Sequence, residues 1–128
     1  MTIPFWCVVV VIFIPFILAG IGGAARGKAF GAADNREPRV QAAQLTGGGA
    51  RIYAAQENAW EAAIMFTAAV LVTHAAGLSA ASAAPWTTAF VVFRALHAIF
   101  YIQDIDKARS GAFLGGLVCI IALIVKAA

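Results

Sequence analysis

Residues 3–25 read IPFWCVVVVIFIPFILAGIGGAA and contain no charged side chain. A helix needs about 20 consecutive apolar residues to cross the hydrocarbon core of a bilayer, so this stretch alone predicts a membrane-spanning helix. It lacks the basic start of a secretory signal peptide and is longer than the apolar region of one, which favours a helix that is retained. Pro15 is expected to kink this helix, and neighbouring helices of a bundle can accommodate the kink.

The whole chain shares this apolar character. Of its 128 residues, 62% are hydrophobic and 12% are charged, and the mean hydropathy is +0.88. A soluble domain of this length could not bury so much apolar surface. The composition therefore predicts one integral membrane domain over residues 1–128. The net charge of +3 comes with no pattern typical of nucleic-acid binding.

Three further apolar runs follow, over roughly residues 49–76, 84–103 and 109–127. All are continuous and none shows the alternation of period two that marks a barrel strand. The predicted fold is therefore all-α, a transmembrane bundle of four helices. The connections are a polar, Gly-rich loop over 26–48, an uncharged turn over 77–83 and a charged turn over 104–108.

Basic residues are distributed unevenly among these connections. They flank the first and third connections and are missing from the second: Arg26, Lys28, Arg36, Arg39, Lys107 and Arg109. Cytoplasmic loops carry an excess of Lys and Arg, so we expect the first and third loops to face the cytoplasm. Both termini and the turn over 77–83 then face the opposite side. We interpret the basic cluster of the first loop as a membrane-surface anchor.

Two of the predicted helices carry a polar stripe. In RIYAAQENAWEAAIMF, residues 51–66, the side chains of Arg51, Asn58 and Glu61 fall within an arc of about 80° on a helix. The third run repeats the pattern within a second arc of about 80°, formed by Arg94, His97, Tyr101 and Asp104.

The depth of the stripes predicts how they pair. With Ile52 and Gln103 placed at the interface and a rise of about 1.5 Å per residue, Glu61 and Arg94 both lie about 14 Å into the membrane. An unpaired charge at that depth costs at least about 2.5 kcal/mol. We therefore expect Glu61 and Arg94 to form an ion pair across the two helices.

Two interpretations of these polar residues remain open. Polar groups inside a membrane can hold helices together without any chemistry. Alternatively, cations, an amide and a phenol on the cytoplasmic side suit a small anionic or zwitterionic ligand. No nucleophile–base pair and no metal-ligand cluster is evident, and Cys7 and Cys119 lie within apolar runs, as small buried hydrophobic residues do. The candidate binding residues are Arg51, Asn58, Glu61, Arg94, His97, Tyr101 and Arg109.

These residues resemble a known pattern, that of the MAPEG family, the membrane-associated proteins of eicosanoid and glutathione metabolism. The stretch over 51–66 is similar to the second-helix signature of that family through Arg51, Ala55, Gln56, Asn58 and Glu61. The stretch FRALHAIFYIQDIDKARSGAF, residues 93–113, resembles the third-helix pattern and the start of the fourth helix through Arg94, His97, Tyr101 and Arg109.

The resemblance implies a bundle that assembles as a homotrimer and binds glutathione as co-substrate in a polar cleft between subunits. Asn58 and Glu61 would hold the tripeptide, Tyr101 would pack or form a hydrogen bond, and Arg109 would stabilise the thiolate as the catalytic residue. Membrane lipid and a lipophilic small molecule are the other implied partners. The sequence departs from the pattern at Ala54, where many catalytic members carry an arginine, and Arg51 is the candidate substitute one turn away.

Two functions follow from these observations. The first is a glutathione-dependent membrane transferase or peroxidase that acts on lipophilic electrophiles or lipid hydroperoxides. The second is a non-catalytic membrane protein, which binds lipid or serves as an accessory or structural subunit and keeps the polar stripe as contacts between helices.

Overall fold

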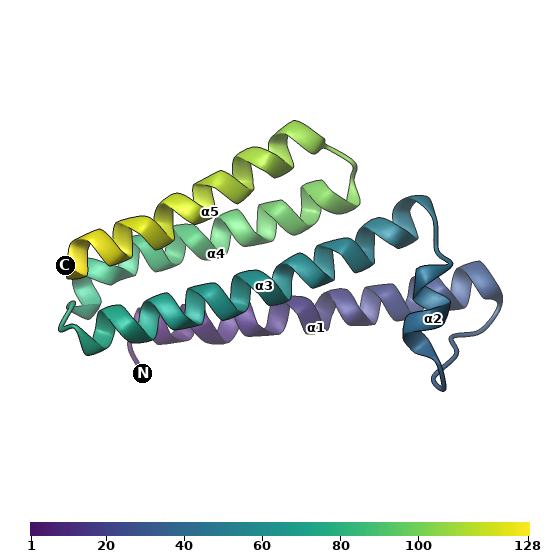
Figure 1. Cartoon of the computed structure of the whole chain (residues 1–128), viewed down its shortest axis with the longest axis horizontal. Helices are drawn as coiled ribbons and strands as arrows, with labels where there is room; N and C mark the ends of the chain where they lie inside the picture. The colour runs from purple at the N-terminus through teal and green to yellow at the C-terminus, as the bar shows by residue number, and fades with distance from the viewer.

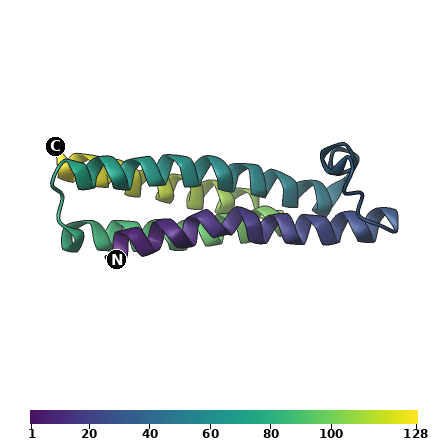
Figure 2. The same cartoon turned by 90° about the horizontal axis from the view of Figure 1, so that it is seen from below.

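The computed structural model describes residues 1–128 as five α-helices with no strand, which confirms the all-helical prediction. Four long helices lie side by side, and both termini lie at one end of the molecule (Figure 1). A short helix, α2, lies beside α1 and α3 at the opposite end, which we call the α2 end (Figures 1 and 2). The helices are α1 (Ile3–Phe30), α2 (Pro38–Ala43), α3 (Gly47–Ala75), α4 (Ala80–Ile102) and α5 (Asp106–Ala127).

The connection over 26–48, predicted as a loop, is largely helical instead. Helix α1 continues to Phe30 and ends at Gly31, whose φ of 81° lies in the left-handed region. Glycine adopts this conformation without a Cβ penalty and commonly ends helices. Pro38 begins α2, because its fixed φ suits the first helical turn and its missing N–H is not needed there.

Three helices are long and apolar enough to cross a membrane: α1, α4 and α5. Helix α3 has 29 residues but does not meet the same hydropathy criterion. Its first half contains Arg51, Glu57, Asn58 and Glu61, which lower its mean hydropathy. Three of the four predicted spans are thus confirmed as apolar enough to cross, and the crossing of α3 stays a prediction.

Helix α4 begins earlier than the predicted residue 84. Ser79 caps it, because its hydroxyl accepts a hydrogen bond from the Ser82 amide at 3.2 Å. Serine is favoured at this position because it satisfies an amide that has no partner within the helix. The turn before α4 shortens accordingly, and Pro85 lies inside the helix.

Packing between the long helices places the core near the middle of the bundle. The rings of Phe66 on α3 and Phe90 on α4 stack with centroids 4.1 Å apart, and both are fully buried. Val11 of α1 and Leu123 of α5 belong to the same buried cluster. At Gly115 a Cβ would lie 2.5 Å from the Phe93 ring, so α5 needs a glycine to approach α4 closely.

The outer faces of the long helices are apolar. Many large hydrophobic side chains are about half exposed or more, among them Phe13, Ile17, Ile64, Val72 and Val125. Such surfaces are unusual on soluble monomers, and they suit contact with lipid.

Candidate functional site

The polar stripes of α3 and α4 face each other where these two helices pack. We call this group the α3–α4 seam, made of Arg51, Asn58, Glu61, Arg94 and Asp104. The two helices run antiparallel, so Arg51 lies level with the end of α4 and Asn58 lies deeper, beside Arg94.

Arg94 is the buried centre of the seam. Only 5% of its surface is exposed, and its Nη2 donates to the Asn58 backbone carbonyl at 3.2 Å and, at short range, to the Asn58 side-chain oxygen. A charge-assisted bond of this kind is stronger than a bond between neutral groups. Asn58 thus meets much of the hydrogen-bonding need of a cation that lies in an apolar bundle.

The predicted ion pair between Glu61 and Arg94 is not formed. Asn58 lies one turn closer to Arg51 than Glu61 does, and its side chain takes the Arg94 contact. Glu61 joins the group indirectly, because the Asn58 amide Nδ2 donates to its Oε2 at 3.4 Å. Glu61 remains exposed on the surface of the chain. The sequence predicted which parts of α3 and α4 lie level with each other, but it predicted Glu61 instead of Asn58 as the partner of Arg94.

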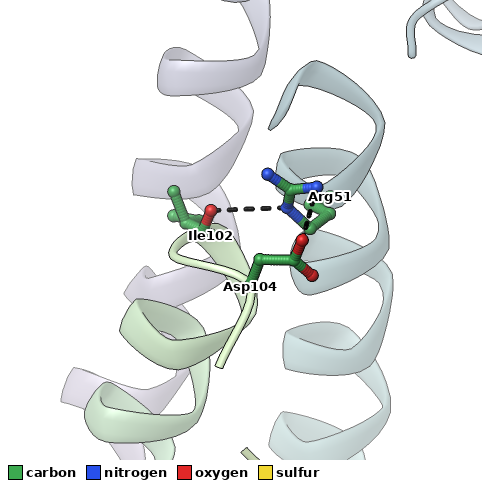
Figure 3. Close-up of polar contacts among 3 residues, drawn as sticks. All are labelled: Arg51, Ile102 and Asp104. Atoms are coloured by element: carbon green, nitrogen blue, oxygen red, sulfur yellow. Dashed lines mark hydrogen bonds and ion pairs between the residues drawn. The ribbon is translucent and has the colours of Figure 1, made fainter. Parts of the chain in front are cut away.

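Arg51 ties the start of α3 to the end of α4 (Figure 3). Its Nη1 lies 3.2 Å from Asp104 Oδ2, and its Nε donates to the Ile102 carbonyl at 3.5 Å. Both contacts use the outer end of the seam. Arg51 is therefore held by a neighbouring helix, and the candidate substitute for the arginine missing at Ala54 is already engaged.

Asp104 occupies an unusual backbone position. Its φ is 63°, the one positive value outside glycine in the chain. The Asp104 amide bonds the Tyr101 carbonyl, and the Ile105 amide bonds the Phe100 carbonyl. This pattern is the Schellman helix end, in which glycine normally occupies the left-handed position. Asp104 takes the glycine position, and its carboxylate binds Arg51.

His97, Tyr101 and Arg109 form a second cluster between α4 and α5. The His97 and Tyr101 rings meet edge to face with centroids 5.6 Å apart, and His97 is 4% exposed. The Arg109 guanidinium carbon lies 4.4 Å from the centre of the Tyr101 ring, in cation–π contact. Arg109 forms no ion pair, so no carboxylate neutralises its charge.

A cavity of about 730 Å³ lies between α1, α2 and α3, and the sequence analysis did not foresee it. We call it the α1–α2–α3 cavity. Apolar walls come from residues such as Ala19, Leu45 and Trp60, and its ionisable side chains are Arg26, Arg39, Tyr53 and Glu57. Its only signal in the sequence was the cluster of basic residues in the first connection, which we had interpreted as an anchor.

Arg26 anchors the connection that closes this cavity. It is 7% exposed, and its Nη1 donates to the Asp34 carbonyl at 2.7 Å and to the Gln41 side-chain oxygen at 3.2 Å. The Gln41 amide in turn donates to the Ala32 carbonyl at 2.9 Å. These bonds hold α2 against α1. The Arg26 Nε is buried and has no hydrogen-bond partner.

Comparison with protein-family models gives one match, described as the MAPEG family, over residues 3–128. The chain belongs to the MAPEG family. No curated protein and no solved structure matches it. Membership, together with three apolar helices, makes the chain an integral membrane protein. At the level of the family it is linked to membrane-bound, glutathione-related transferases and peroxidases.

The MAPEG pattern can now be placed on the structure. Its second-helix and third-helix residues meet in the seam and in the cluster around Tyr101. Ala54, where this chain departs from the MAPEG pattern, lines the α1–α2–α3 cavity instead. An arginine at position 54 would therefore place its side chain at the wall of the cavity, not in the seam.

Proposed function

We propose that this MAPEG protein is a glutathione-dependent membrane transferase or peroxidase that acts on lipophilic electrophiles or lipid hydroperoxides. Glutathione enters from the cytoplasm at the α2 end, and the lipophilic substrate arrives from the bilayer. Family membership supports the chemistry, and the basic residues at this end support its orientation. The proposed assembly is the homotrimer that the family resemblance implies.

The observation that carries the proposal is the state of Arg109. Its guanidinium is held over the Tyr101 ring but is not neutralised by a carboxylate. It also lies in the first turn and a half of α5, where the helix N-terminus favours an anion. A cation beside a thiol favours the thiolate, which is the reactive nucleophile.

The thiolate serves both candidate reactions. In a transferase, its sulfur forms a bond to an electrophilic carbon while the leaving group departs or the adjacent double bond takes up a proton. In a peroxidase, the sulfur attacks the outer peroxide oxygen and releases the lipid alcohol. A second glutathione then reduces the resulting sulfenic acid and yields the disulfide and water.

A titration of glutathione into the detergent-purified protein tests this proposal. We expect thiolate absorbance in the ultraviolet to rise with glutathione and saturate. Arg109→Ala should abolish that rise, whereas Arg109→Lys should keep part of it, because a cation remains. If the wild-type protein neither binds glutathione nor ionises its thiol, the enzymatic function is wrong.

One observation favours the second candidate, a non-catalytic lipid-binding or accessory subunit. Arg51 and Arg94 are engaged by groups of the chain itself, so the seam resembles a contact that stabilises the bundle. Under this alternative, glutathione gives no thiolate signal. A lipid that remains bound through purification, identified by mass spectrometry, is the positive result for this function.

A further inference from the structure

The arginines of the molecule differ in their partners. Arg51 binds Asp104, Arg94 binds Asn58, and Arg109 packs on Tyr101. Arg26 and Arg39 line the α1–α2–α3 cavity. An anionic group in this cavity would meet Arg39, which has no polar partner, and Arg26, which has one buried nitrogen without a partner.

Arg26 gives the strongest indication of a missing ligand atom. Its side chain is 7% exposed, and its Nε has no hydrogen-bond partner although Nη1 has two. A buried donor without a partner is costly, and native structures rarely keep one. An acceptor supplied by a ligand in the cavity would remove this cost.

Arg39 adds a second cation from a different element. It lies on α2, is exposed, and makes no hydrogen bond or ion pair. Glu57 contributes a carboxylate from the α3 wall of the same cavity. Two cations and one carboxylate around a space of about 730 Å³ match a zwitterion with more negative than positive groups. The volume falls within the roughly 300–1,000 Å³ of small-molecule sites.

We propose that α2 serves as part of the glutathione site, with Arg39 and Arg26 binding a carboxylate of the tripeptide and Glu57 binding its ammonium group. This inference rests on the proposed function and adds residues that lie outside the polar stripes. Arg39 thereby supplies, from α2, the cation that Ala54 does not supply from α3.

The packing of the helices determines how such a site reaches Arg109. Helix α2 contacts only α1 and α3, whereas α5 packs against α4 and α3. Arg109 and the cavity therefore lie on different sides of one chain. Under this proposal, the Arg109 that meets the thiol of a glutathione in the cavity belongs to a neighbouring copy of the proposed homotrimer.

Arg39→Ala is the substitution that tests this subsite, because the residue is exposed and its loss leaves the fold intact. We expect the affinity for glutathione, measured by titration of the detergent-purified protein, to fall about tenfold, since one charge-assisted contact is lost. The thiolate absorbance at saturating glutathione should stay unchanged, because Arg109 is intact. Arg36→Ala is the matched control: Arg36 lies in the same connection but does not line the cavity.

Restoring a cation on the opposite wall provides a second measurement. Arg39→Ala combined with Ala54→Arg should recover most of the lost affinity, because residue 54 lines the same cavity. If Arg39→Ala lowered the affinity only by disturbing the structure, Ala54→Arg on α3 would not restore the affinity.

The outcomes separate this inference from the proposed function. If the wild-type protein binds and ionises glutathione and Arg39→Ala behaves like Arg36→Ala, the subsite is overturned while the function stands. If the wild-type protein gives neither binding nor ionisation, the function is wrong and the subsite has no ligand. A tenfold loss that Ala54→Arg reverses supports both.

Discussion

Two polar regions lie on different faces of α3 and differ in how their charges are satisfied. In the α3–α4 seam, Arg94 is buried and donates to two acceptors of Asn58. In the α1–α2–α3 cavity, Arg39 has no partner and Arg26 keeps one buried nitrogen unbonded. Both regions contain two arginines, and both use residues from the first half of α3.

This difference distinguishes arginines that stabilise the fold from arginines that are available to bind a ligand. A cation that the chain already satisfies gains little from a ligand, because binding must first break the existing contact. A cation without a partner offers its full interaction to a ligand. By this reasoning the seam holds the helices together, and the cavity is the proposed site of an anionic ligand.

The largest expected effect is on stability and concerns the seam. Arg94→Ala leaves the Asn58 side-chain oxygen without its donor, and we expect it to lower the free energy of unfolding by about 2–3 kcal/mol. Arg39→Ala should change it by less than about 0.5 kcal/mol, as for an ordinary surface substitution. Unfolding midpoints in detergent measure both. Equal effects of the two substitutions would contradict the division between seam and cavity.

A substitution on α1 that displaces a side chain of the cavity wall tests whether the cavity binds glutathione. A Cβ at Gly22 would lie 2.9 Å from the Tyr53 ring, which lines the cavity. Gly22→Ala should push the ring into the cavity, weaken glutathione binding severalfold, and cost about 1 kcal/mol of stability. Gly23→Ala is the matched control, because no atom lies within 4 Å of its added Cβ. Titration and unfolding of both variants check the prediction, and equal affinities would show that Tyr53 does not shape the site.

The smallest expected effect concerns the outer end of the seam. Asp104→Asn removes an ion pair in which the carboxylate is exposed and the arginine partly exposed, and it should cost about 0.2–1 kcal/mol. Asp104→Gly removes the same pair but relieves the left-handed backbone, a gain of about 1 kcal/mol. The glycine variant should therefore unfold at or above the wild-type temperature and the asparagine variant below it. The reverse order would mean that glycine relieves no backbone strain at residue 104.

Sequence alone predicted the four long helices well, because each contains a long apolar run. It also predicted which residues share a face, so Arg51, Asn58, Arg94 and Asp104 were placed on the sides that meet. It did not predict that Arg94 would bind Asn58 rather than Glu61. These two residues lie one helical turn apart, and the choice between them depends on side-chain conformation.

The cavity could not be foreseen for a different reason. Helix α2 has six residues, too few for a periodic pattern, and α1 extends past its apolar run. Arg26 is buried through contacts with Asp34 and Gln41, up to 15 residues away in the chain. Without that fold-back, a cluster of basic residues between two apolar runs is typical of a membrane anchor.

The central claim is that glutathione extends from the cavity of one copy to Arg109 of the next. Co-expression of the Arg39→Ala and Arg109→Ala variants tests it directly, with thiolate absorbance read at a glutathione concentration near the wild-type dissociation constant. Mixed oligomers contain some sites with both arginines intact, so we predict a signal above that of either variant alone. A signal no higher than that of the better single variant would show that no site is shared in this way.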